Sequence, residues 1–141
     1  MMTDTLSNKF KMLSILMLII GYLSFSSLAV AHDNHSHLPA VTHLTAIEAK
    51  ALLATRPDLQ VLDVRTKGEY NRGHIDGAIR NNYFSLKFKK RLRQLDRNTA
   101  YLVHCKSGHR SNGAVKVMQR EGFQDIYHLD GGYDAWKKLA P

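Results

Sequence analysis

The chain has 141 residues, of which 44% are hydrophobic and 23% are charged. This composition is typical of a globular protein and excludes an intrinsically disordered chain, and the length predicts one folded domain. Lysine and arginine outnumber the acidic residues by 20 to 12, a net charge of +8, which favours anionic partners without specifying them.

Residues 1–31 have the three parts of a secretory signal peptide. Lys9 and Lys11 precede the apolar run MLSILMLIIGYLSFSSLAVA, which ends in the small-x-small sequence Ala29-Val30-Ala31. Such a run is also long enough to be an uncleaved membrane anchor, but a glycine and four serines interrupt it. We therefore expect cleavage after Ala31, export, and no stable membrane association afterwards. Nucleic acid is not expected as a partner of an exported protein.

Residues 32–40, HDNHSHLPA, form a polar stretch without periodicity, and we expect a flexible lead-in to a folded domain at 41–141. Its histidines His32, His35 and His37 are of a type that binds zinc, copper or nickel. A mobile stretch without preformed geometry binds such ions weakly, so we assign no metal site to the chain, and metal binding by this cluster stays open.

Short apolar strands and helices alternate along the rest of the chain. A Thr-x-x-Glu capping box at Thr45 opens a helix that ends before Pro57, with Leu44, Ile47 and Ala51 on one face. The expected strands are 61–64, 77–79, 100–104 and 126–129. The later helices are expected at 66–73, 85–95, 111–121 and 133–139. This alternation predicts an α/β fold with a parallel sheet covered by helices on both faces.

The chain has a single cysteine, Cys105, in the sequence VHCKSGHRS (103–111). One cysteine cannot form an internal disulfide, and a free cysteine is often only a small buried hydrophobe. Here, however, the cysteine lies where a strand gives way to a helix, at the carboxyl end of the sheet where α/β proteins place ligands. Gly108 allows the loop to curl so that its N–H groups point inward, and Lys106 and Arg110 add positive charge. Each effect lowers the pKa of a thiol, so we expect an ionised and exposed sulfur.

Two chemistries use a cysteine in an anion-binding loop that ends in arginine: sulfur transfer and phosphate-ester hydrolysis. The loop here is Cys-x4-Arg, which encloses a pocket suited to one extra sulfur atom. The phosphatase loop is one residue longer and holds a tetrahedral phosphoryl group. Loop length therefore favours sulfur transfer.

The stretches VLDVRTKGEYNRGHIDGAI (61–79) and YLVHCKSGHRSNGAVKVMQREGFQDIYHLDGGYDAW (101–136) closely resemble a single-domain rhodanese, of the periplasmic type once the leader is included. The resemblance implies a five-stranded parallel sheet with helices on both faces and a persulfide carried on Cys105. It implies thiosulfate or a similar anion as donor, cyanide or a thiol as acceptor, and no cofactor. A persulfide carrier dedicated to a protein partner, or a regulatory domain, remains as an alternative.

The loop residues Lys106, Ser107, Gly108, His109 and Arg110 are predicted to bind the anionic substrate and the persulfide. For His109 a solvent-facing position is the alternative. Outside the loop we interpret Asp63 and Arg65 as an internal ion pair, His74 as a partner of backbone groups at a turn, and Trp136 as a packing residue. The basic sequence KFKKRLRQL (87–95) is interpreted as the solvated face of a helix.

Overall fold

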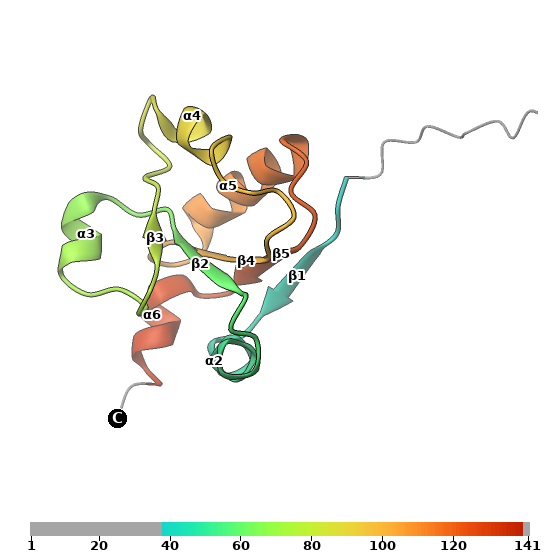
Figure 1. The fold of residues 1–141 in the computed structure, drawn as a ribbon. Helices are drawn as coiled ribbons and strands as arrows, with labels where there is room; N and C mark the ends of the chain where they lie inside the picture. The colour runs from blue at the N-terminus through green and yellow to red at the C-terminus, as the bar shows by residue number, and fades with distance from the viewer. Residues whose placement is uncertain (1–37, 140–141) are drawn as a thin grey trace, which may run out of the picture. The chain divides into compact units, whose positions relative to one another are not determined.

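This computed structural model describes residues 38–139, and within them the strands form one five-stranded sheet in the order β1-β5-β4-β2-β3 (Figure 1). All four neighbouring pairs of strands are parallel. The strands are β1 (Val41–Leu44), β2 (Gln60–Asp63), β3 (Ile79–Arg80), β4 (Tyr101–His104) and β5 (Ile126–Leu129). The helices are α2 (Ala46–Thr55), α3 (Lys67–Asn71), α4 (Phe88–Leu92), α5 (His109–Arg120) and α6 (Gly132–Lys137).

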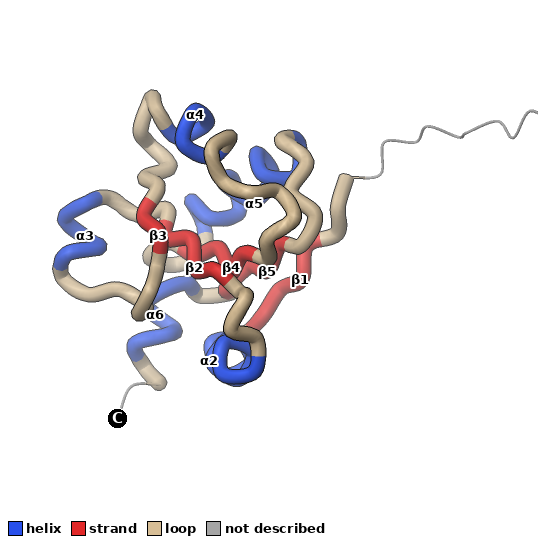
Figure 2. Tube along the Cα trace, in the orientation of Figure 1, coloured by secondary structure: helices blue, strands red, loops and turns tan. Residues whose placement is uncertain are grey.

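Helices cover both faces of the sheet, which confirms the predicted α/β class. In Figure 1, α4 and α5 lie above the sheet, whereas α2 and α6 lie below it, and Figure 2 shows the strands as a single layer between them. Two apolar clusters follow from this arrangement. The upper cluster contains Leu62, Leu92 and Met118, and the lower contains Ala49, Leu102 and Leu129. The central strand β4 is buried along its whole length.

Both predicted capping boxes are present. The Thr45 hydroxyl accepts a hydrogen bond from the Glu48 N–H at the start of α2, and Thr66 and Glu69 do the same at the start of α3. Each box pairs two backbone donors that a helix leaves unsatisfied at its first turn. The second box also fixes the backbone from which the Glu69 side chain projects.

Three local predictions were wrong. The edge strand β1 was not among the strands expected from the residue pattern. The helix predicted at 85–95 is only five residues long, Phe88–Leu92, and its N-cap residue, Lys87, makes no side-chain capping hydrogen bond. On α2 the buried residues are Ala46 and Ala49, while Ile47 is 69% exposed, so the predicted apolar face was misplaced.

The residues interpreted as structural have that role. Arg65 and Asp63 form a buried ion pair with a 2.6 Å separation between Nη2 and Oδ2. His74 Nδ1 lies 3.1 Å from the Tyr70 carbonyl oxygen and its ring stacks on Tyr70. Trp136 packs against the lower cluster.

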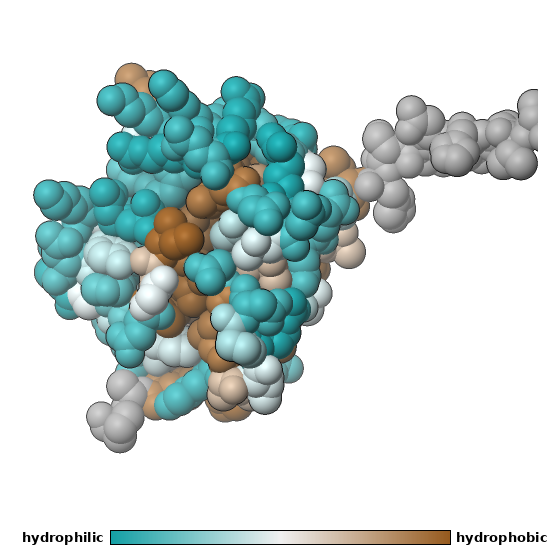
Figure 3. Space-filling view, in the orientation of Figure 1, coloured by the Kyte–Doolittle hydropathy of each residue, from teal (hydrophilic) through white to brown (hydrophobic). Residues whose placement is uncertain are grey.

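The face of the molecule seen in Figure 3 is mostly hydrophilic, with apolar surface gathered in a strip near its centre. Within residues 38–139, no helix has both the length and the apolar content that crossing a bilayer requires. The predicted signal peptide and the cluster of His32, His35 and His37 lie outside the described residues. Of the predicted lead-in, residues 38–40 are described, and the Pro39 carbonyl accepts a hydrogen bond from Gln119.

Candidate active site

Cys105 directly follows β4 at the centre of the sheet, and α5 begins four residues later at His109. Gly108, the residue before α5, has a φ of +99°, a left-handed conformation that glycine adopts without steric cost. This conformation curls the loop back over the cysteine. The strand-to-helix junction predicted for Cys105 is therefore confirmed.

The amino end of α6 holds the cysteine loop from below. The Tyr133 N–H donates to the Cys105 carbonyl at 2.8 Å, and the Asp134 N–H donates to the Lys106 carbonyl at 2.9 Å. A Cβ atom on Gly132 would lie 2.6 Å from the Cys105 carbonyl oxygen, so only glycine allows this close approach. With its carbonyl groups bound to α6, the loop has its N–H groups free to face the sulfur.

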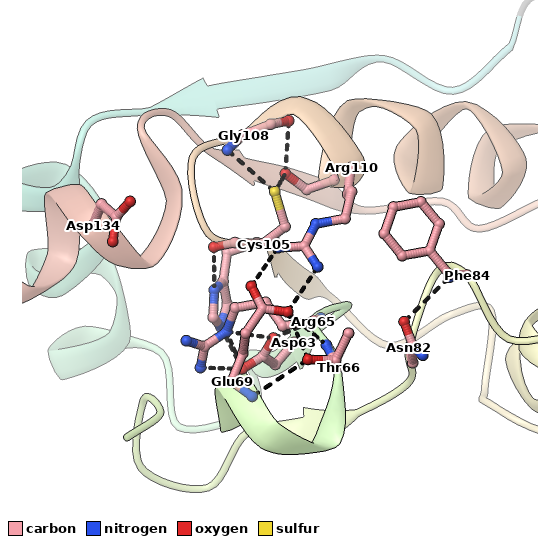
Figure 4. A network of polar contacts seen from close by, with 12 residues as sticks. Asp63, Arg65, Thr66, Glu69, Asn82, Phe84, Cys105, Gly108, Arg110 and Asp134 are labelled. Atoms are coloured by element: carbon pink, nitrogen blue, oxygen red, sulfur yellow. Dashed lines mark hydrogen bonds and ion pairs between the residues drawn. The ribbon is translucent and has the colours of Figure 1, made fainter. Parts of the chain in front are cut away.

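The sulfur of Cys105 accepts hydrogen bonds from its own loop (Figure 4). The Gly108 N–H donates to Sγ at 3.2 Å, and the Ser111 hydroxyl lies 3.5 Å from Sγ. Burial raises the pKa of the thiol, but hydrogen bonds from the Ser111 hydroxyl and from backbone N–H groups of Ser111, Ser107 and Gly108 outweigh it, so the pKa of Cys105 is lowered. The loop therefore favours a thiolate, as the sequence predicted.

The prediction that this sulfur is exposed was wrong, because Cys105 is only 1% exposed. Its side chain points back into the curl of the loop and joins the upper apolar cluster. The site thus combines the burial expected of an inert cysteine with the hydrogen bonds expected of a reactive one. A reagent must pass the side chains around the loop to reach Sγ.

Arg110 has a partner within the protein that the sequence did not predict. Its guanidinium forms a two-pronged ion pair with Glu69, with N–O distances of 2.8 and 2.6 Å. Both side chains are less than one-fifth exposed. The hydrogen bonds to Glu69 raise the pKa of Arg110 most, and the nearby sulfur of Cys105 raises it further. Arg110 therefore lies beside the sulfur while its charge is already paired with Glu69.

The remaining predicted loop residues surround the sulfur without their side chains binding it. Lys106 and His109 are exposed. Lys106 lines a cavity of about 530 Å³ that it shares with Glu69 and Arg72, and His109 lines a second cavity of about 600 Å³ that it shares with Arg110. Ser107 contributes through its backbone N–H. The ion pair thus connects Glu69, which lines the first cavity, with Arg110, which lines the second.

The residue pattern did not assign Ser111, Glu69 or His128 to the site. From the sequence, Ser111 is predicted only as the start of a helix and Glu69 only as part of a capping box. His128, on β5, lies with Nε2 2.9 Å from the Ser111 hydroxyl oxygen. Glu69 meets Arg110 across 41 residues and His128 meets Ser111 across 17, so no local spacing could have revealed either contact. The capping box was the one available signal for where Glu69 lies.

A parallel α/β domain with a hydrogen-bonded cysteine loop after its central strand defines a class of proteins with a nucleophilic cysteine in an anion-binding cradle. Residues 45–139 match the family model described as "Rhodanese-like domain". The chain belongs to this family.

The chain is also similar to curated and solved proteins. The chain is 37% identical over 104 residues to the thiosulfate sulfurtransferase GlpE of Shewanella oneidensis, covering 74% of this chain and 94% of that protein. A rhodanese-related protein from Thermoplasma volcanium is 26% identical with a TM-score of 0.62, covering 71% of this chain and 95% of that one. A protein of Rhodopseudomonas palustris described as a possible tyrosine phosphatase is 29% identical with a TM-score of 0.60, covering 70% and 80%.

Proposed function

We propose that this protein is a sulfurtransferase that moves sulfane sulfur from thiosulfate or a similar anion to cyanide or a thiol through a persulfide on Cys105. The observation that carries the proposal is the set of hydrogen bonds that the loop directs at the Cys105 sulfur. The 37% identity to a thiosulfate sulfurtransferase supports the same reaction.

In the first half-reaction the Cys105 thiolate attacks the outer sulfur of thiosulfate. A new sulfur–sulfur bond forms to Cys105, the bond inside thiosulfate breaks, and sulfite leaves with the electron pair. The persulfide carries the negative charge on its terminal sulfur. Because the loop N–H groups are fixed before the reaction, they stabilise this charge without reorganising.

In the second half-reaction an acceptor attacks the terminal sulfur of the persulfide. Cyanide forms a carbon–sulfur bond and leaves as thiocyanate, or a thiolate forms a new persulfide. The electron pair of the broken bond returns to Cys105 as thiolate. Two half-reactions joined by a covalent intermediate predict ping-pong kinetics.

The ion pair between Arg110 and Glu69 suggests how an anion enters. The two carboxylate oxygens of Glu69 occupy the guanidinium of Arg110, and two oxygens of a sulfonate group offer a similar planar pairing. We propose that the donor takes this position from Glu69 and so brings its outer sulfur to Cys105. The nearby Lys106, Arg72 and Lys137 line the cavity on the Glu69 side and add positive charge there.

The burial of Cys105 and the length of its loop bear on the alternative functions, a persulfide carrier and a phosphatase. The near-complete burial of Cys105 is compatible with a carrier that opens only for a protein partner, which would load sulfur but turn over slowly with small acceptors. Phosphatase activity is disfavoured because four residues, rather than five, lie between Cys105 and Arg110. Phosphate-ester hydrolysis by this chain would refute that reasoning.

The predicted signal peptide bears on where in the cell the protein acts. We propose export to the periplasm with cleavage after Ala31, on the basis of residues 1–31. Sequencing the amino terminus of the protein recovered from the periplasmic fraction should find His32 first. Recovery of the intact leader in the membrane fraction would contradict this.

Steady-state kinetics test the function. Thiocyanate formation, measured at several fixed cyanide concentrations while thiosulfate varies, should give parallel double-reciprocal lines. Cys105→Ser should abolish turnover, and Ser107→Cys in that background should not restore it because residue 107 is exposed, whereas residue 105 is buried among the loop N–H groups. Intersecting lines, or turnover in Cys105→Ser, would refute the covalent mechanism.

A further inference from the structure

A second cluster of reactive side chains lies on the far side of Ser111 from the cysteine. His43 on β1, His128 on β5 and Asp130 just after β5 place three ligand atoms together. His43 Nδ1 and His128 Nδ1 each lie 2.9 Å from Asp130 Oδ1, and the two nitrogens lie 3.3 Å apart. Parallel pairing of β1 with β5, which places His43 opposite His128, produces this convergence.

We propose that His43, His128 and Asp130 form a zinc site, and that a bound ion redirects the Ser111 hydroxyl toward Cys105. The proposal goes beyond sulfur transfer and does not depend on it.

The geometry of the three atoms suits a tetrahedral ion. With bonds of 2.0–2.2 Å to nitrogen and oxygen, ligand atoms in a tetrahedral zinc site lie about 3.3 Å apart. The two histidine nitrogens already have this separation, and the contacts to Asp130 need to lengthen by only about 0.4 Å. His43 and Asp130 are each about half exposed, so they can make this adjustment. Two imidazoles, one carboxylate and an open fourth position form a donor set that zinc accepts.

His128 has the inner contact that a metal-binding histidine needs. Its side chain is 2% exposed, and its other nitrogen, Nε2, lies 2.9 Å from the Ser111 hydroxyl oxygen. Histidines that bind metals are commonly held by a hydrogen bond from the second ring nitrogen, which fixes the ring orientation and the tautomer. Here that second contact leads directly to the cysteine loop.

The coupling between the zinc site and Cys105 depends on where the protons of His128 and Ser111 lie. Without metal, Nδ1 of neutral His128 donates to the Asp130 carboxylate, so Nε2 has a lone pair and competes with Cys105 Sγ and the Gly108 carbonyl for the Ser111 proton. Zinc on Nδ1 requires the lone pair there, so exchange with water moves the ring proton to Nε2, which then donates to the Ser111 oxygen. The single hydroxyl proton of Ser111 is left with two acceptors, Cys105 Sγ at 3.5 Å and the Gly108 carbonyl at 2.9 Å. Zinc therefore strengthens the hydrogen bond to the sulfur.

Competition between the purified, untagged protein and a chromophoric zinc chelator tests the binding. One zinc per chain should bind, and Mg²⁺, which prefers oxygen ligands, should not compete. His43→Ala and Asp130→Asn should each weaken zinc binding by at least about tenfold, since even outer-shell changes cost that much. The matched control His74→Ala removes another exposed histidine and should change nothing. Thermal unfolding checks that each variant is folded.

Two further variants exclude other zinc ligands. Binding should survive in Cys105→Ser, which removes the thiolate, and in the triple variant His32→Ala, His35→Ala, His37→Ala, which removes the histidines of the lead-in. Loss of the zinc in either variant, equal affinity in folded His43→Ala, or no binding at all would overturn the site.

The rate at which iodoacetamide alkylates Cys105 tests the coupling. At pH values below the plateau of the rate profile, saturating zinc should raise the alkylation rate by about two- to tenfold. This change corresponds to one hydrogen bond. In Ser111→Ala zinc should still bind but leave the rate unchanged. An unchanged rate in the zinc-bound natural protein, or an undiminished effect in Ser111→Ala, would overturn the hydrogen-bond route.

Discussion

Replacing Ser111 by alanine removes a side-chain hydroxyl within reach of the Cys105 sulfur and leaves the backbone N–H donors in place. A hydrogen bond to a charged acceptor contributes about 1.5–3 kcal/mol. The Ser111 oxygen lies 3.5 Å from the Cys105 sulfur, and its one proton is shared among three acceptors. Both features favour the lower end of this energy range. A loss of about 1.5 kcal/mol shifts the thiolate–thiol equilibrium roughly tenfold toward the thiol.

The assay is the rate of Cys105 alkylation across pH, followed by intact mass. In Ser111→Ala the rate below the plateau should fall roughly tenfold, while the plateau at high pH stays the same because every sulfur is ionised there. The control Ser107→Ala removes an exposed hydroxyl from the same loop but keeps its backbone N–H, so its profile should match the natural protein. A Ser111→Ala profile that overlays the natural one would refute the role of this hydroxyl.

Three other substitutions have defined outcomes. Glu69→Gln keeps the α3 capping box but frees Arg110, so the KM for thiosulfate should fall roughly two- to fivefold; a higher KM would contradict the proposed entry route. Because hydrogen bonds from Arg110 hold the pKa of Glu69 well below its usual range, the natural protein should lose stability as pH falls through the acid range, and this loss should be smaller in Glu69→Gln. Asp63→Asn leaves the Arg65 charge buried without a full partner, and urea unfolding should show a loss of about 3–5 kcal/mol; less than 1 kcal/mol would contradict the burial argument. Gly132→Ala should lower both the unfolding temperature and sulfur loading more than Gly77→Ala, since both have positive φ but only a Cβ at 132 meets the Cys105 carbonyl; equal effects would contradict the fit between α6 and the loop.

Local patterns were enough to predict the parts of the fold that local interactions determine. The Thr-x-x-Glu boxes predicted the starts of α2 and α3. Gly108 predicted the curl of the cysteine loop, and its N–H does reach the sulfur. In each case the residues that interact lie within a few positions of one another.

The failures have a common origin in contacts between distant segments. Strand β1 has only four residues, with its middle two exposed, and it exists because β5 pairs with it. The position of the cysteine loop depends on α6, whose N–H groups bind carbonyl groups of the loop from almost 30 residues away. The pairing of Arg110 with Glu69 depends on α3 lying against the loop. A single sequence contains no periodicity that reports such contacts.

The most direct test is the intact mass of the protein after incubation with thiosulfate. Sulfur transfer through Cys105 predicts a gain of one sulfur atom, its removal by cyanide, and no gain in Cys105→Ser. An unchanged mass with thiosulfate and with other sulfane donors, in protein whose Cys105 is unoxidised, would contradict the persulfide on which the proposed function depends.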